Sequence, residues 1–213
     1  MIERNSVESS SELPDYTNED VVRQIFERDD PEELKRYQEA SGLSTEQIEY
    51  YVAFAKMRKK VHEDMAVELE GRRASSQTPS QEELSAGLFR EMLEPQVRQA
   101  VFTLRNKGYP TYESGFYGIG AVQRIGVESD RFAQAQISPE VIKKLTNIGV
   151  QVELTSRTIE LKFDKVVSLD EIQAAWDLLA EDLPDLGHVA EPSNIPSAEI
   201  FRSRVNSLDS TGK

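Results

Sequence analysis

The chain has 213 residues, of which 38% are hydrophobic and 30% are charged, and its formal net charge is −13. This length allows one large domain, or a domain of about 100 residues with an extension. The absence of cysteine excludes a disulfide framework, a thiolate nucleophile and a zinc–thiolate site.

No stretch of the sequence predicts a membrane protein. A helix that spans a bilayer needs about 18 consecutive apolar residues, and no run approaches that length. The segment Met1–Ser11 is polar and lacks the apolar centre of a signal peptide. We therefore expect a cytoplasmic protein without membrane contact.

The negative charge is concentrated in the first part of the chain. Residues 1–94 contain 22 acidic and 12 basic side chains, whereas residues 95–213 contain 16 and 13. Nucleic-acid binding relies on Lys and Arg that displace counterions, so this balance predicts no nucleic-acid partner. It favours a basic protein partner, although acidity that only keeps the protein soluble is the alternative.

The pattern up to residue 70 predicts a helical N-terminal region. Residues 1–16 lack apolar periodicity and are expected to be disordered. In the helical region, 17–70, Thr17 is the predicted cap of a first helix, and Asp30-Pro31 begins a second that ends at Gly42. Ser44 and Gln47 form a capping box for a third helix, expected to reach about Leu69.

A change of composition separates this region from the next. Residues 71–80 contain Gly, Arg, Ser, Gln, Thr and Pro without apolar periodicity, and are interpreted as a linker. Thr78 is the expected cap of a following helix, with Gln81 as its capping-box partner. Pro95 must interrupt that helix, and a new one is expected from Pro95 to Gly108.

Residues 81–184 predict an α+β domain. Two hairpins are each followed by a helix: strands 109–117 and 121–127, then strands 150–154 and 159–163. The second hairpin alternates apolar and polar residues, which indicates one buried and one wet face. The order αββαββα predicts a four-stranded antiparallel sheet with helices on one face. Residues 185–213 are expected to be a flexible tail, in which Ile200, Phe201 and Val205 form a cluster that could dock.

No arrangement of residues indicates a catalytic group, a cofactor or a metal. His62 stands beside Glu63 and Asp64 but lacks a second His at helical spacing, and His188 lies in the expected tail. The glycines between 115 and 120 lie in a hairpin and open no helix, so they do not form a dinucleotide loop. The basic run Lys56–Lys60 is interpreted as a solvated helix face. Enzymatic activity stays uncertain because strand carboxylates leave a carboxylate-dependent hydrolase open: Glu113, Glu128, Glu153 and Glu160.

The aromatic strand is the candidate recognition surface. Its residues fall within nine positions: Tyr109, Tyr112, Glu113, Phe116 and Tyr117. Strand alternation predicts Tyr109, Glu113 and Tyr117 on one face and the remaining two on the other. Tyr is favoured at recognition surfaces because it has a large apolar ring and a polar tip. The alternative is that both sets are buried, one under the domain's helices and one under the N-terminal helices.

These observations predict a non-catalytic interaction or regulatory protein. It would bind a protein partner through the acidic helices or through the aromatic face of the sheet. The alternative is a small-molecule-binding or carboxylate-dependent hydrolytic domain with a pocket near strand 109–117. Convergent carboxylates with a shifted pKa in a pocket would favour the alternative, whereas a flat apolar patch would favour the first hypothesis.

Overall fold

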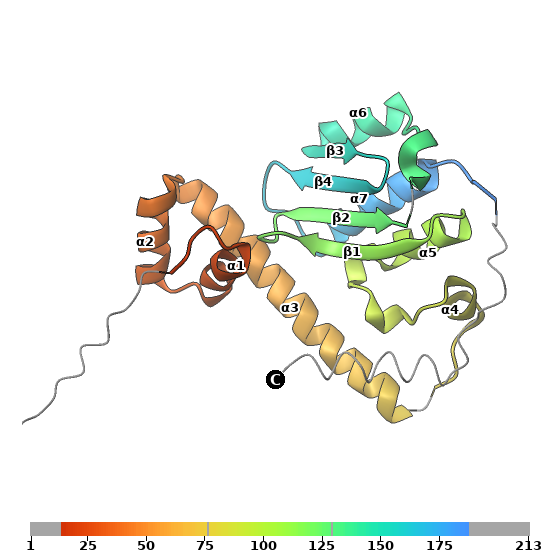
Figure 1. The fold of residues 1–213 in the computed structure, drawn as a ribbon, viewed down its shortest axis with the longest axis horizontal. Helices are drawn as coiled ribbons and strands as arrows, with labels where there is room; N and C mark the ends of the chain where they lie inside the picture. Colours follow the sequence, from red (N-terminus) through yellow and green to blue (C-terminus); the bar gives the residue numbers. More distant parts are fainter. Residues whose placement is uncertain (1–13, 76, 129, 188–213) are drawn as a thin grey trace, which may run out of the picture.

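The computed structural model describes residues 14–75, 77–128 and 130–187 (Figure 1). Most of the expected disordered segment 1–16, and all of the expected tail beyond residue 187, lie outside the described residues. The candidate docking cluster in that tail is therefore not described either.

The described elements follow one another as helices, hairpin, helix, hairpin and helix. In chain order they are α1 (Glu19–Arg28), α2 (Pro31–Ser41), α3 (Thr45–Ser75), α4 (Gln81–Ala86), the 3-10 turns η1 (Arg90–Met92) and η2 (Pro95–Val97), α5 (Arg98–Asn106), β1 (Thr111–Tyr117), β2 (Val122–Val127), η3 (Arg131–Gln134), α6 (Pro139–Asn147), β3 (Val150–Leu154), β4 (Thr158–Phe163) and α7 (Leu169–Asp182). The four strands form one antiparallel sheet in the order β1-β2-β4-β3. The predicted α+β class is confirmed.

The helix caps show where the sequence signals were ambiguous. Asp30 and Gly42 cap α2 at its two ends, as predicted, with Gly42 in the left-handed conformation. The cap of α1 is Asn18 rather than Thr17, because the Asn18 side chain accepts the first-turn N–H bonds. The Thr17 hydroxyl instead donates to the Asp15 carboxylate.

α3 ends later than predicted. Ser44 and Gln47 form the predicted reciprocal bonds at its start. The helix passes Gly71 and reaches Ser75, so the first part of the expected linker 71–80 is helical. The N-cap of α4 is Ser80, which forms a capping box with Glu83, so the prediction of a Thr78–Gln81 cap is wrong. Pro95 begins only the short turn η2, and the helix expected from that residue starts at Arg98.

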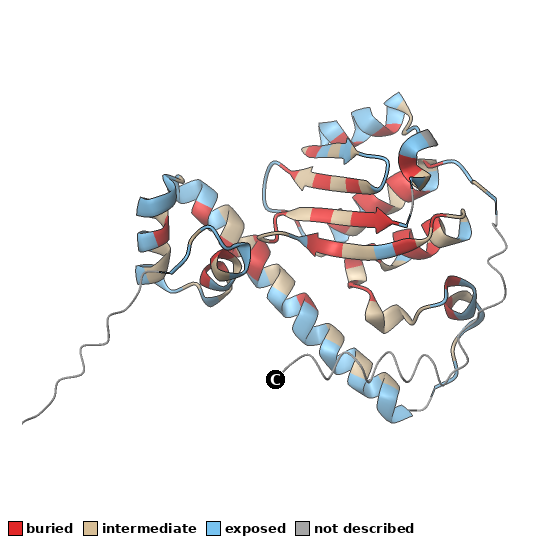
Figure 2. Ribbon diagram, viewed as in Figure 1, coloured by how far each residue is buried: buried red, intermediate tan, exposed pale blue. Residues whose placement is uncertain are grey.

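Helices cover one face of the sheet. Ile125, Ile159 and Leu161 point inward from β2 and β4 and are fully buried. α5 and α7 lie behind the sheet and pack against each other (Figures 1 and 2). The buried side of α7 includes Trp176, as the helical spacing of its apolar residues predicted.

α3 belongs to two hydrophobic clusters. Its first half packs on α1 and α2, where Val52 and Ala55 join Phe26 in a small core. Phe54 and Val61, on other sides of the same helix, belong to the core of the sheet domain. The Phe54 ring lies 6.3 Å from the Phe163 ring, and the Tyr50 hydroxyl donates to the Phe163 carbonyl at 2.6 Å. One continuous helix therefore connects both cores.

The outer edge of β1 is occupied by side chains. The buried Glu94 accepts a hydrogen bond from the Phe116 N–H at 2.9 Å. Arg105 donates to the Thr111 carbonyl and, at 2.8 Å, to the Thr111 hydroxyl. Gly115 permits the approach of Glu94, because a Cβ at that position would overlap the Glu94 carboxylate. The backbone at this edge is thus already partly satisfied.

Candidate interaction surface

The face of the sheet opposite α5 and α7 is open. In Figure 1 no described helix crosses in front of it, and Tyr112 and Tyr117 are exposed, so the alternative in which the N-terminal helices bury the second set of aromatic residues is wrong. The strand register brings polar and aromatic side chains together on this side. We call it the open face, and it consists of Tyr112, Glu113, Tyr117, Arg124, Gln151, Glu153, Glu160 and Lys162.

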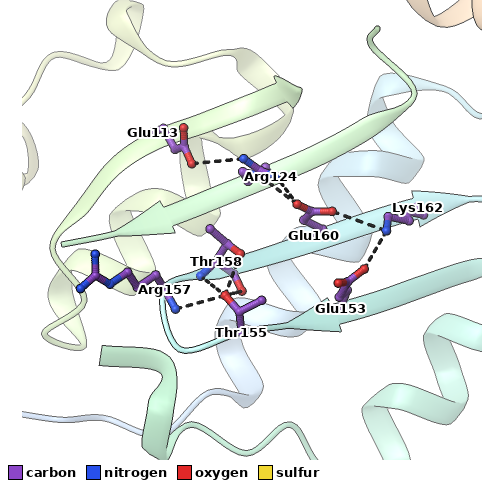
Figure 3. A network of polar contacts seen from close by, with 8 residues as sticks. All are labelled: Glu113, Arg124, Glu153, Thr155, Arg157, Thr158, Glu160 and Lys162. Carbon is purple, nitrogen blue, oxygen red and sulfur yellow. Dashed lines mark hydrogen bonds and ion pairs between the residues drawn. The ribbon is translucent and has the colours of Figure 1, made fainter. Parts of the chain in front are cut away.

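Ion pairs connect all four strands across the open face (Figure 3). Arg124 on β2 donates through Nε to Glu160 on β4 at 2.9 Å, and its Nη1 lies 3.8 Å from Glu113 on β1. Lys162 lies 2.7 Å from Glu153 on β3 and 3.6 Å from Glu160. The hydrogen bond from Lys162 lowers the pKa of Glu153, and the same bond raises the pKa of Lys162. These charges are satisfied within the molecule.

The turn between β3 and β4 is fixed by its own hydrogen bonds. The Thr155 hydroxyl accepts from the N–H of Arg157 at 3.2 Å and lies 2.8 Å from the Thr158 hydroxyl (Figure 3). The Arg157 side chain extends past this turn and donates to Asp130 at 2.9 Å. The end of the open face near β3 is therefore a tight polar turn.

Two tyrosines stand on the open face at β1. Tyr112 is 56% exposed and Tyr117 is 40% exposed. The Arg124 guanidinium lies 3.1 Å from the centre of the Tyr117 ring, a cation–π contact that restricts the ring. The neighbouring Glu113 carboxylate raises the pKa of Tyr112, so its hydroxyl stays protonated at neutral pH.

A β-bulge places Tyr112 on this side. The pairing of β1 with β2 shifts between Thr111 and Glu113. A Cβ on Gly126 would lie 2.9 Å from the Tyr112 ring and 2.8 Å from Cγ of Glu113, so both side chains lie over this glycine. The prediction that Tyr112 and Glu113 point to opposite faces is wrong, because an extra residue in one strand breaks the alternation.

The other two predicted aromatic residues belong to the core. Tyr109 is fully buried, stacks on Phe132 with the ring centres 5.2 Å apart, and donates to the Pro184 carbonyl at 3.0 Å. Phe116 is also buried. Of the five predicted residues, the structure therefore brings Tyr112, Glu113 and Tyr117 together at the surface.

The acidic helices adjoin the Tyr117 end of the open face. Residues 14–49 contain eleven acidic and four basic side chains, a net charge of −7. The turn after Tyr117 contacts both α1 and α3. A Cβ on Gly118 would lie 4.0 Å from Glu19, and the Gly118 carbonyl accepts from Arg58 at 3.2 Å. Tyr117 is thus close to the acidic region.

Sequence reasoning missed the buried polar residues beside β1. Besides the Phe116 N–H, Glu94 accepts from Gln96 at 2.6 Å and lies 2.8 Å from Nε2 of His62 on α3. Gln96 in turn donates to Gln123 at 3.1 Å. Glu94 precedes a proline in a segment of mixed polarity, and no local pattern indicates that its carboxylate is buried.

A hollow of about 390 Å³ lies away from the aromatic strand, between the last turns of α3 and the segment around η1. Its arginines are engaged in ion pairs: Arg72 with Glu83 at 3.0 Å, Arg90 with Glu82 at 2.9 Å, and Arg98 with Glu68. The pocket near strand 109–117 that the hydrolytic alternative requires is not supported by this hollow.

Comparison of the chain with protein-family models, with curated proteins and with solved structures gave no match. Within the described residues, no helix is long and apolar enough to cross a membrane, and no three His, Cys, Asp or Glu side chains gather as a metal site would require.

Proposed function

We propose that the chain is a non-catalytic interaction protein that binds a basic protein partner on the open face. The observation that carries this proposal is the exposed pair Tyr112 and Tyr117 on a sheet face that no described element covers. Exposed tyrosines give large contact areas and lose little conformational freedom on binding.

Because the charged side chains of the open face pair with one another, we expect the partner to be recognised there by its shape rather than by its charge. Arg124 and Glu160 satisfy each other, so a partner does not have to supply counter-charges for them. Long-range attraction comes instead from the acidic residues 14–49, next to Tyr117. Such a field accelerates association with a basic partner and weakens as salt is added.

Nucleic acid is not the partner we propose. Within the basic run 56–60, Lys56 pairs with Asp29 at 2.5 Å and Lys60 pairs with Asp64 at 2.9 Å. Arg58 is committed to the Gly118 carbonyl. A phosphate backbone would compete with these partners inside a strongly acidic region. As part of the same proposal, we place this cysteine-free protein in the cytoplasm.

Affinity capture from the native host, with three versions of the tagged protein, tests the proposal. The double variant Tyr112→Ala/Tyr117→Ala should lose a basic partner that the unchanged protein retains. The control Val67→Ala removes an apolar side chain from α3 that is even more accessible, at 73% exposed, and should retain the partner. Equal melting temperatures would show that all three proteins are folded. A partner that the double variant retains in full would contradict the proposal.

A further inference from the structure

The outer edge of β3 carries unpaired backbone groups. Hydrogen bonds from Thr155 N–H to the Thr158 carbonyl and from Asp164 N–H to the Gly149 carbonyl, each 2.9 Å, fix which residues bond to β4. Because bonding alternates along an antiparallel strand, Gln151 and Glu153 point their backbone groups toward β4. The N–H and C=O groups of Val150, Val152 and Leu154 therefore point outward, and among the described residues they have no hydrogen-bond partner.

This edge differs from the opposite one. At β1, Glu94 and Arg105 bind the outward backbone groups. β3 contains neither proline nor lysine, the residues that commonly protect an exposed edge. Its one charged residue, Glu153, is held by Lys162 over the open face. On α6 (Pro139–Asn147), which packs against β3, Ile142 is exposed by 37%, and Ile148 at the end of this helix is exposed by 51%.

We propose that β3 pairs with β3 of a second copy of this chain, antiparallel and centred on Val152. In this register Val152 of each copy faces Val152 of the other, and Val150 faces Leu154. Each facing pair exchanges both of its backbone hydrogen bonds, because these are the residues whose groups point outward. A two-fold axis through the centre relates the copies, as in most homodimers.

The side chains of β3 suit a second copy in this register. Gln151 of one copy stands opposite Glu153 of the other, so an amide donor meets a carboxylate acceptor twice and no like charges face each other. The two-fold axis is perpendicular to the sheet, so both open faces lie on the same side of the dimer. In the proposed dimer, Ile142 on α6 and Ile148 at the end of this helix, both exposed, add apolar surface near the same contact.

Position 151 gives a test in which the dimer and the monomer respond in opposite directions. Within one chain, Gln151 pairs with Lys162. Gln151→Glu therefore adds a favourable cross-strand pair to the monomer but sets two carboxylates against each other at both contacts of the dimer. Gln151→Lys has the reverse effect: it sets two positive charges against each other within one chain and places a lysine opposite Glu153 at both contacts of the dimer. Sedimentation equilibrium of the full chain over a range of concentrations should show a dimer for the unchanged protein. It should also show about tenfold weaker association for Gln151→Glu and tighter association for Gln151→Lys.

Melting temperatures at concentrations where the chain is monomeric should change in the opposite order, higher for Gln151→Glu and lower for Gln151→Lys. Val152→Pro adds a second test, because it removes an outward N–H that β4 does not use and should abolish the dimer. A monomer at every concentration that the protein tolerates would overturn the proposal. A dimer that is insensitive to the charge at 151 would overturn it too.

Discussion

Tyr109 and Tyr112 are three residues apart but have opposite environments. Tyr109 is enclosed, with its hydroxyl bonded to the Pro184 carbonyl, whereas Tyr112 lies over Gly126 in contact with solvent. An odd separation along an extended chain places the two rings on opposite sides, and the bulge after Thr111 decides that Tyr112 lies on the open face beside Glu113.

Truncation of these two tyrosines should therefore give very different stabilities. Tyr109→Ala should lower the free energy of unfolding by about 3–5 kcal/mol, because it leaves a cavity in the core. Tyr112→Ala should change it by less than about 0.5 kcal/mol, as exposed positions usually do. Urea denaturation measures both. A large loss of stability for Tyr112→Ala would show that its ring is structural.

Gly115 offers a test of the β1 edge. Its φ is +112° and a Cβ would overlap the Glu94 carboxylate, so Gly115→Ala should lower the free energy of unfolding by more than about 2 kcal/mol. Gly42→Ala is the matched control, since Gly42 has a φ of +72° but open space around its Cα. The control isolates the cost of positive φ, about 1–2 kcal/mol. Equal losses for both variants would mean that Glu94 moves aside without cost.

At the scale of elements, α4 is held by the carboxylate of Glu83. This side chain accepts bonds from the N–H groups of Ser80 and Arg90 and pairs with Arg72 at the end of α3. Burial alone would raise the pKa of Glu83, but these bonds outweigh it and hold the pKa below its ordinary value of 4.5. The start of α4 thus depends on an ionised group.

This lowered pKa predicts the direction of acid sensitivity. Because the folded-state pKa lies below the unfolded-state value, Glu83 contributes stability above the unfolded-state pKa and loses it as pH falls through the folded-state pKa. Glu83→Gln should be less stable than the unchanged protein at pH 7, and the gap should narrow as pH falls below 4.5. Thermal melts across this range measure the gap. For the control Glu39→Gln, on the exposed side of α2, the difference in stability from the unchanged protein should not change in this way with pH.

The sequence predicted the elements better than their junctions. Hairpin 150–163 and α7 have strict periodicity and complete capping signals, and both form as predicted. α3 passes Gly71 because Arg72 and Phe89 form a tertiary contact that no local pattern contains. The exposed pair of tyrosines was predicted only in part, because a bulge depends on the pairing with β2 and not on β1 alone.

At the scale of the whole molecule, α3 makes the two hydrophobic clusters interdependent. Val52 and Ala55 complete the small core with α1 and α2, whereas Phe54 and Val61 complete the core of the sheet domain. If the chain is shortened from its N-terminal side so that α3 is removed, the sheet domain therefore loses two fully buried side chains.

Truncation tests this dependence. A chain that begins at Thr45 keeps α3 and should retain a cooperative thermal transition. A chain that begins at Thr78 lacks Phe54 and Val61 and should melt at a clearly lower temperature, because each lost aromatic or aliphatic core residue costs about 2–5 kcal/mol. If both chains melt at the same temperature, residues 78–187 form an independent unit and the predicted linker 71–80 separates two domains.

The occupied edge of β1 limits how far the sheet can grow. Glu94 and Arg105 already bind backbone groups that an incoming strand would need, so a strand added at that side would have to displace a buried carboxylate. Addition at β3 therefore has no counterpart at the opposite end of the sheet. Growth of a sheet into a fibre requires two edges per molecule that can accept a strand, and the part of the chain that the structure describes provides one. Association through β3 therefore stops at the dimer.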